Sequence, residues 1–236
     1  SDESNNNIGL GSRALSGLTS GGNNIGIGYN SLGNGNTTFN NNIGIGTHAG
    51  DTSSTSNNIF IGTESGKNNG NGTNNINIGY RSGYGTGNSG DDNVIVGSNA
   101  GYNINGGASN ILFGNNAGYN LVSGESNIKI GKDSGYYFTI NDFNTFIGFE
   151  AGRGTQSWFD SGDYTNTNGT TENGKVKGDA NLFVGYRSGY SLTSGYQNVG
   201  LGYQAGKELT TGRHNNFIGF EAGVACTTGT NNSCIG

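Results

Sequence analysis

The chain has 236 residues, 48 of them glycine and none proline, and its formal net charge is -5 at pH 7. Without proline or a Gly-X-Y period it is neither a collagen nor a polyproline linker. Its acidic balance, with lysines and arginines scattered, argues against a nucleic-acid-binding face, and no apolar run is long enough to span a membrane.

A five-residue frame, Asn-apolar-any-apolar-Gly, recurs along the whole chain, and apart from one step successive frames start 16 to 18 residues apart. A unit this short cannot bury its own apolar face, so the period predicts coils stacked into a solenoid. We expect a single all-β repeat domain over 1–236, a parallel β-solenoid in the form of a flattened β-roll, with two short strands in each coil. About thirteen coils of ~17 residues are predicted, with frames that begin at Asn7, Asn24, Asn42, Asn58, Asn75, Asn93, Asn110, Asn127, Asn144, Asn181, Asn198, Asn215 and Asn232.

Within each frame, apolar and variable positions alternate, which is the period of a strand with one buried face. The fourth position is large and apolar in every frame and the second in most, so these two positions are predicted to form the core. The third position would then face outward, where a long apolar stripe marks a subunit interface; turns that cover this stripe within a monomer are the alternative. The interface residues predicted in this way are Phe60, Ile95, Leu112, Phe146, Phe183 and Phe217.

Each frame glycine is followed by two variable residues and then by an alanine or serine in all twelve complete repeats. We expect the small residue where a narrow coil brings its backbone close to the opposite wall. The glycines that flank it allow the positive φ angles of a tight corner.

Tyrosines follow the second glycine of the corner at the same offset in four successive coils. Equal offsets stack above one another in a parallel solenoid, so these residues are predicted to form an aromatic ladder that stabilises the stack. A flat aromatic surface that binds sugar rings is the alternative. The residues are Tyr84, Tyr102, Tyr119 and Tyr136.

One step, from Asn144 to Asn181, is 37 residues long, and its excess lies in 153–180. This insertion contains the single tryptophan, Trp158, together with Phe159 and Tyr164. Insertions in solenoids project from one face and often bind partners, so we predict the most distinctive contact surface there. A purely decorating loop, or one that packs on a neighbouring subunit, is the alternative.

Residues that carry chemistry are few. Cys226 and Cys234 are predicted to form a disulfide that pins the last coil, which would indicate an oxidising, extracellular setting. The two histidines, His48 and His214, lie in distant coils and are not expected to share a site. Because no catalytic carboxylate pair, zinc motif or phosphate-binding loop is found, we expect no enzyme activity, no metal and no cofactor.

The segments 23–28 and 41–46, both Asn-Asn-Ile-Gly-Ile-Gly, resemble the hexapeptide repeat in the heads of YadA-like trimeric autotransporter adhesins. The inward Val and Ile of that family match Ile25 and Ile27. Similar repeats occur in tail fibres of phages and large viruses. The likeness covers nearly the whole chain, although the turns are longer, aromatic positions such as Tyr80 are added, and no coiled-coil stalk or anchor is visible. It implies a left-handed β-roll assembled as a homotrimer.

These patterns together predict an extracellular, cell-surface or virion-surface protein, an adhesin head or fibre that mediates surface attachment. Its expected partners are further copies of itself and a host surface protein or glycan. A self-assembling filament, a viral fibre shaft and an ice-binding solenoid are the alternatives, although no threonine column is sustained, since the residue after the frame glycine reads Ser12, Tyr29, Thr47. Because the last repeat stops at Gly236 in mid-frame, we expect a fragment of a longer chain.

Overall fold

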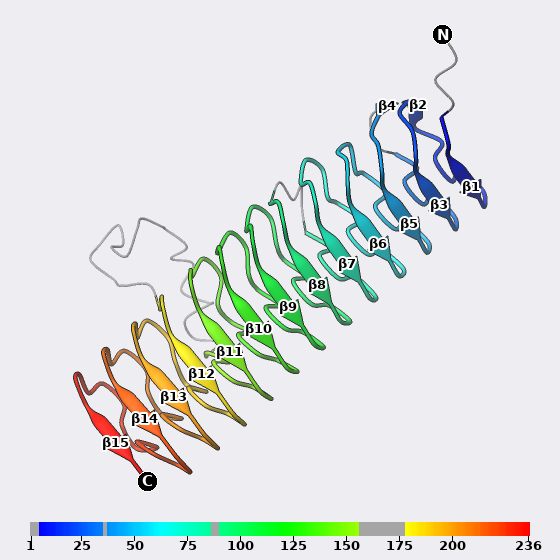
Figure 1. Ribbon diagram of the computed structural model, residues 1–236. Helices are drawn as coiled ribbons and strands as arrows, with labels where there is room; N and C mark the ends of the chain where they lie inside the picture. The colour runs from blue at the N-terminus through cyan, green and yellow to red at the C-terminus, as the bar shows by residue number, and fades with distance from the viewer. Residues whose placement is uncertain (1–4, 35–36, 86–89, 156–177) are drawn as a thin grey trace.

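The computed structural model describes residues 5–34, 37–85, 90–155 and 178–236. The chain winds into a rod of stacked coils with its two termini at opposite ends (Figure 1). One three-residue strand from each coil joins a 13-stranded sheet that runs along one long side of the rod. The predicted all-β parallel solenoid is therefore confirmed, and the described residues contain no helix.

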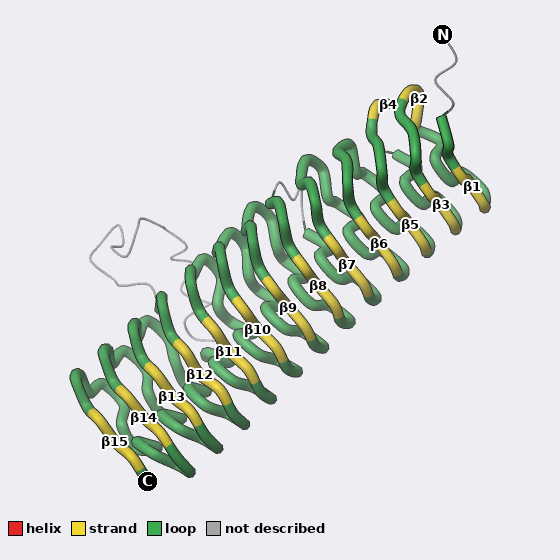
Figure 2. The backbone as a smooth tube through the Cα atoms, viewed as in Figure 1, coloured by secondary structure: helices red, strands yellow, loops and turns green. Residues whose placement is uncertain are grey.

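The strands of the long sheet are β1 (Ile8–Leu10), β3 (Ile25–Ile27), β5 (Ile43–Ile45), β6 (Ile59–Ile61), β7 (Ile76–Ile78), β8 (Val94–Val96), β9 (Ile111–Phe113), β10 (Ile128–Ile130), β11 (Thr145–Ile147), β12 (Leu182–Val184), β13 (Val199–Leu201), β14 (Asn216–Ile218) and β15 (Ser233–Ile235). A second pair, β2 (Leu18–Ser20) and β4 (Thr37–Thr38), lies in the first coils. The prediction of two strands in every coil is wrong, because turns make up the other sides of the later coils (Figure 2).

Strand register follows the frames without a slip. Each strand pairs in parallel with the same frame positions of the next coil, as Lys129 does with Phe146. The 37-residue step leaves this pairing intact, since Phe146 of β11 lies opposite Phe183 of β12. The solenoid is therefore continuous on both sides of the insertion.

The strand side chains of the core come from the third frame position, not from the second and fourth positions as predicted. A column of residues between the strands completes the core, and it includes Ile104, Leu121, Leu192 and Leu209. The six residues assigned to an outer subunit interface are all fully buried inside their own chain, and they are Phe60, Ile95, Leu112, Phe146, Phe183 and Phe217. The interior of the coil is narrow and takes one strand side chain per coil. Where that position is glycine a larger neighbour fills the space, since a Cβ on Gly200 would lie 2.3 Å from the Phe183 ring.

Two polar residues at the third position divide the core into three apolar clusters. Asn77, fully buried, separates the cluster around Phe60 from the one around Ile95 and Leu112. Lys129, also fully buried, separates the second cluster from the C-terminal one around Phe146. The amide nitrogen and oxygen of Asn77 both lack a hydrogen-bond partner, which makes this residue a costly member of the core.

The predicted small residues lie on the wall opposite the strands, as expected. Ser65 donates a hydrogen bond from Oγ to the carbonyl oxygen of Asn77 at 2.7 Å, and Ser188 donates one to Gly200 at 2.9 Å. These bonds join the corner of one coil to the strand of the next. The residues equivalent to these serines in other coils, such as Ala49, Ala100 and Ala117, are fully buried.

The first frame position forms a buried asparagine ladder, a feature that the sequence interpretation missed. Asn110 is typical: its Oδ1 accepts hydrogen bonds from the backbone nitrogen and from Nδ2 of Asn127, both at 3.0 Å. Asn127 Nδ2 also donates to the carbonyl oxygen of Asn141 at 2.8 Å. Aspartate lacks the amide donor that this ladder needs, which explains why every frame begins with asparagine.

Candidate interaction surfaces

The outward side of the long sheet carries two columns of apolar side chains, here called the aliphatic face. It consists of the second and fourth frame positions, of which all thirteen fourth positions and ten of the thirteen second positions are apolar. None of these positions is charged. Most of these side chains are half-buried, and the exposed ones include Ile111 and Ile218, each at 41%, and Phe113 at 54%. An uncharged apolar strip that runs along the whole sheet is longer than the patches that monomeric proteins usually expose.

Four aromatic residues that directly follow the frame glycine extend the aliphatic face in the C-terminal coils, and they are called the aromatic column: Phe149, Tyr186, Tyr203 and Phe220. Their rings stack with centroid distances of 5.4, 5.1 and 5.1 Å. All four are exposed, Phe220 to 67%. The Lys132 ammonium lies 5.6 Å from the Phe149 ring and covers the end of the stack.

The tyrosine ladder predicted from equal offsets is present on another side of the coils. Neighbouring rings of Tyr84, Tyr102, Tyr119 and Tyr136 are stacked at 5.0 Å. Burial raises the pKa of the Tyr119 and Tyr136 hydroxyls. Because each ring face is covered by the next ring, the ladder offers edges and hydroxyls to a ligand, and it has no open platform on which sugar rings could stack.

Cations continue the tyrosine ladder at both ends. At one end, the Lys67 ammonium lies 5.9 Å from the Tyr84 ring. At the other, Arg153 takes the place of a tyrosine, since it follows Gly152 as Tyr136 follows Gly135. Its guanidinium lies 5.7 Å from the Tyr136 ring and 5.5 Å from the Tyr190 ring. The tyrosine ladder therefore continues from Tyr136 to Tyr190, with cation–π contacts to Arg153 in place of ring stacking.

Two ion-pair groups lie beside the tyrosines. Glu64 contacts Lys67 at 2.8 Å and Arg81, in the next coil, at 2.6 Å. The hydrogen bond from Lys67, followed by that from Arg81, lowers the pKa of the Glu64 carboxyl. Glu150 and Arg187 repeat the pair at 2.6 Å after the insertion. Partly exposed pairs of this kind join neighbouring coils and contribute little to stability individually.

The histidines lie apart, as predicted. His48 Nδ1 is 2.8 Å from Asp51 Oδ2, and the buried Asp51 carboxylate also accepts hydrogen bonds from Asn30 and Asn34. His214, in the coil of β14, lies 2.6 Å from Gln197 Oε1 through Nε2. Since Asn30 and Asn34 belong to the coil of β3 and His48 and Asp51 to that of β5, these bonds join two neighbouring coils.

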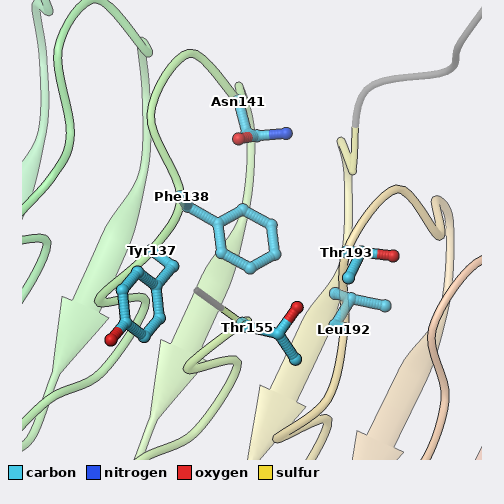
Figure 3. Close-up of a pocket in the computed structure, with 7 residues that line it drawn as sticks. Tyr137, Phe138, Asn141, Thr155, Leu192 and Thr193 are labelled. Atoms are coloured by element: carbon cyan, nitrogen blue, oxygen red, sulfur yellow. The ribbon is translucent and has the colours of Figure 1, made fainter. Parts of the chain in front are cut away.

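A small hollow lies where the insertion leaves the rod (Figure 3). Thr155 occupies the position that Phe138 and Leu192 have in their own coils, and the smaller side chain leaves a gap between them. The hollow is too small to hold a water molecule, so it is not a ligand site.

Both cysteines are free thiols, so the predicted disulfide is absent and the extracellular setting loses that support. Cys234 is the third-position residue of β15, and Cys226 has the position of Leu209 in its coil. Both pack against the C-terminal core cluster, where they act as small apolar side chains. Trp158, Phe159 and Tyr164 of the predicted binding loop lie outside the described residues.

Within the described ranges, no three His, Cys, Asp or Glu side chains come together in a way that could hold a metal ion. The same residues include no apolar helix of membrane-spanning length. Comparison of the chain with protein-family models, with curated proteins and with solved structures finds no match.

Proposed function

We propose that this chain is a rod-shaped segment of a surface-attachment fibre or adhesin head, in which three copies associate side by side through the aliphatic face. The exposed aliphatic face carries the proposal. The repeat motif of the chain resembles that of YadA-like heads and viral tail fibres, and this resemblance also supports the proposal. An extracellular or virion-surface location and a host protein or glycan as the attached partner belong to the same proposal.

An aliphatic face that stays in water is energetically unfavourable. Burial of apolar surface stabilises by about 25 cal/mol per Å², and a specific interface buries about 800 Å² per partner. Two apolar side chains in each of ten coils, and one in each of the other three, supply a surface of this kind. Because the face holds no charged position, association costs no desolvation of ions.

In this association the contact between chains lies at the second and fourth frame positions, and the third position lies inside each chain. Residues such as Phe60 and Phe146 hold the coils together within one chain. Residues such as Ile111 and Phe113 would hold chains together.

Light scattering on the purified chain tests the association. We expect a mass three times that of one chain, unchanged between about 0.1 and 1 M salt, because apolar contacts are not screened by ions. A stable monomer at micromolar concentration would contradict the proposal. A mass that falls as salt rises would indicate that the chains associate through the charged Glu64–Arg81 side of the rod and not through the aliphatic face.

A further inference from the structure

The aliphatic face changes its composition along the rod. In the eight strands β1, β3 and β5 to β10, every second-position residue is isoleucine or valine. From β11 onward three of the five second positions are polar, namely Thr145, Asn216 and Ser233. The fourth position stays apolar throughout, so one of the two columns is interrupted in the C-terminal coils.

The opposite change occurs at the residue after the frame glycine. In the coils before β11 this position is mostly polar, as in Thr47, Thr63 and Asn115, with Tyr29 and Tyr80 as exceptions. From β11 to β14 it is always aromatic, which gives the exposed and stacked aromatic column. The two changes both begin at β11. The apolar surface is displaced sideways by one column in the coils of β11 and β14, and it widens to three columns in those of β12 and β13, where Leu182 and Val199 keep the second position apolar.

We infer that a second copy of this chain lies obliquely along the rod. It covers the second and fourth columns in the N-terminal coils, and the fourth and aromatic columns from β11 to β14. This inference rests on the proposed association. Neighbouring strands of a sheet rotate relative to one another, so a straight partner does not stay above the same column. Aromatic side chains are also enriched in the buried centres of interfaces.

A second copy is the occupant that fits this surface. The stripe is uncharged and repeats once per coil along the entire sheet, so the partner needs an apolar stripe of similar length and repeat. Another copy of the chain has such a stripe. A compact globular partner would cover a few coils and leave the rest of the stripe in water.

Four single substitutions to glutamate, two in each of two coils, test the displaced stripe. In the coil of β5 they are Ile43→Glu, in the second column, and Thr47→Glu, after the frame glycine. In the coil of β14 they are Asn216→Glu and Phe220→Glu, at the same two positions. We expect Ile43→Glu and Phe220→Glu to raise the dissociation constant of the assembly by about tenfold or more, since each places a charge in the contact. Thr47→Glu and Asn216→Glu should change it by less than about threefold.

The pattern of effects separates this inference from the proposal on which it rests. If the unmodified chain is a monomer, both are wrong. If Ile43→Glu and Asn216→Glu weaken association while Phe220→Glu does not, the association stands and the displacement is wrong. Equal weakening by all four substitutions would also contradict the displacement. Should a glutamate variant fail to fold, as judged by circular dichroism, Ile43→Thr and Phe220→Thr replace them, because threonine occupies the same positions in other coils at Thr145 and Thr47.

Discussion

Lys129 is the most unfavourable residue of the core. Its side chain lies between Leu112 and Phe146 in the register of the sheet, and it is fully buried. Nζ has the carbonyl oxygen of Gly135 at 3.5 Å and the Phe138 ring centroid at 5.7 Å as its neighbours. Burial without a carboxylate partner lowers the pKa of the Lys129 ammonium to about 7.

Replacement of Lys129 by methionine should stabilise the rod at neutral pH. The unfolded chain keeps the lysine proton up to the ordinary pKa of 10.5, whereas the folded chain releases it at about 7. Between these values the unfolded state binds more protons, so the stability of the unmodified protein rises with pH across this window. Lys129→Met removes this dependence and should gain about 3 to 5 kcal/mol at and below pH 7, with a gain that shrinks as pH rises.

Chemical denaturation of both proteins at about pH 6.5 and pH 9 measures the difference. The exposed Lys132→Met serves as the control and should show no such trend. The gain in the free energy of unfolding from Lys129→Met could instead be the same at both pH values. That result would mean that Lys129 stays charged in the folded state at pH 9 and would contradict the prediction.

At the scale of the element, the asparagine ladder links each coil to the next. Asn58 forms hydrogen bonds to the coils on both sides: its backbone nitrogen donates to Asn42 Oδ1 at 2.8 Å, and its own Oδ1 accepts from the backbone nitrogen of Asn75 at 2.9 Å. Its Nδ2 donates to the carbonyl oxygen of Gly72 at 3.0 Å. The preceding residue, Asn57, is exposed and has a φ of 65°.

Adjacent asparagines therefore give a matched pair of variants. Asn58→Ser leaves the buried N–H of Asn75 without its partner and removes one of three side-chain donors to the carbonyl oxygen of Gly72, and should cost about 1 to 3 kcal/mol. Asn57→Ser should cost less than about 1 kcal/mol, because Ser109 and Ser126 adopt the same positive φ at the equivalent position. Thermal unfolding of the two variants measures the contrast, and equal losses would refute the ladder as the main support of the coil.

The stacking of the coils can be predicted well from the sequence, but the side of each strand that faces the core cannot. The spacing of the frames determines the parallel register, the small residues of the corners and the tyrosine ladder, because each depends on the period alone. Which side of the strand faces inward does not follow from the period. The outward positions of this chain are more uniformly apolar than the inward ones, where the core accepts Gly200, Asn77 and Lys129. The strict recurrence of asparagine at the first frame position is the signal in the sequence for the buried ladder.

The whole molecule is a rod with one interruption in its repeat. In an ordinary coil two residues, such as those at 193–194, join Leu192 to Gly195. Thr155 and Gly178 have the equivalent positions in the interrupted coil, so 156–177 stands in place of those two residues. The coil resumes at once, since Ala180 donates a backbone hydrogen bond to the carbonyl oxygen of Asp142 at 3.1 Å.

Replacement of 156–177 by a two-residue Ser-Gly turn should leave the rod folded, because it restores the 17-residue step. Circular dichroism and the unfolding midpoint should stay close to those of the unmodified chain. If the insertion, with Trp158, is the attachment site, binding to host cells or to a glycan array should be lost. A folded variant with undiminished binding would move the attachment site to the coils, and loss of folding would show that the insertion is structural.

The two polar interruptions of the core also determine how such a rod would respond to force. A pull along the axis loads all the coils in series, and the joint with the weakest side-chain packing opens first. Those joints are the coils of Asn77 and Lys129, where apolar contacts between neighbouring clusters are broken. Under tension the rod would therefore extend in separate steps at two internal hinges, and each apolar cluster would stay intact as a stiff block.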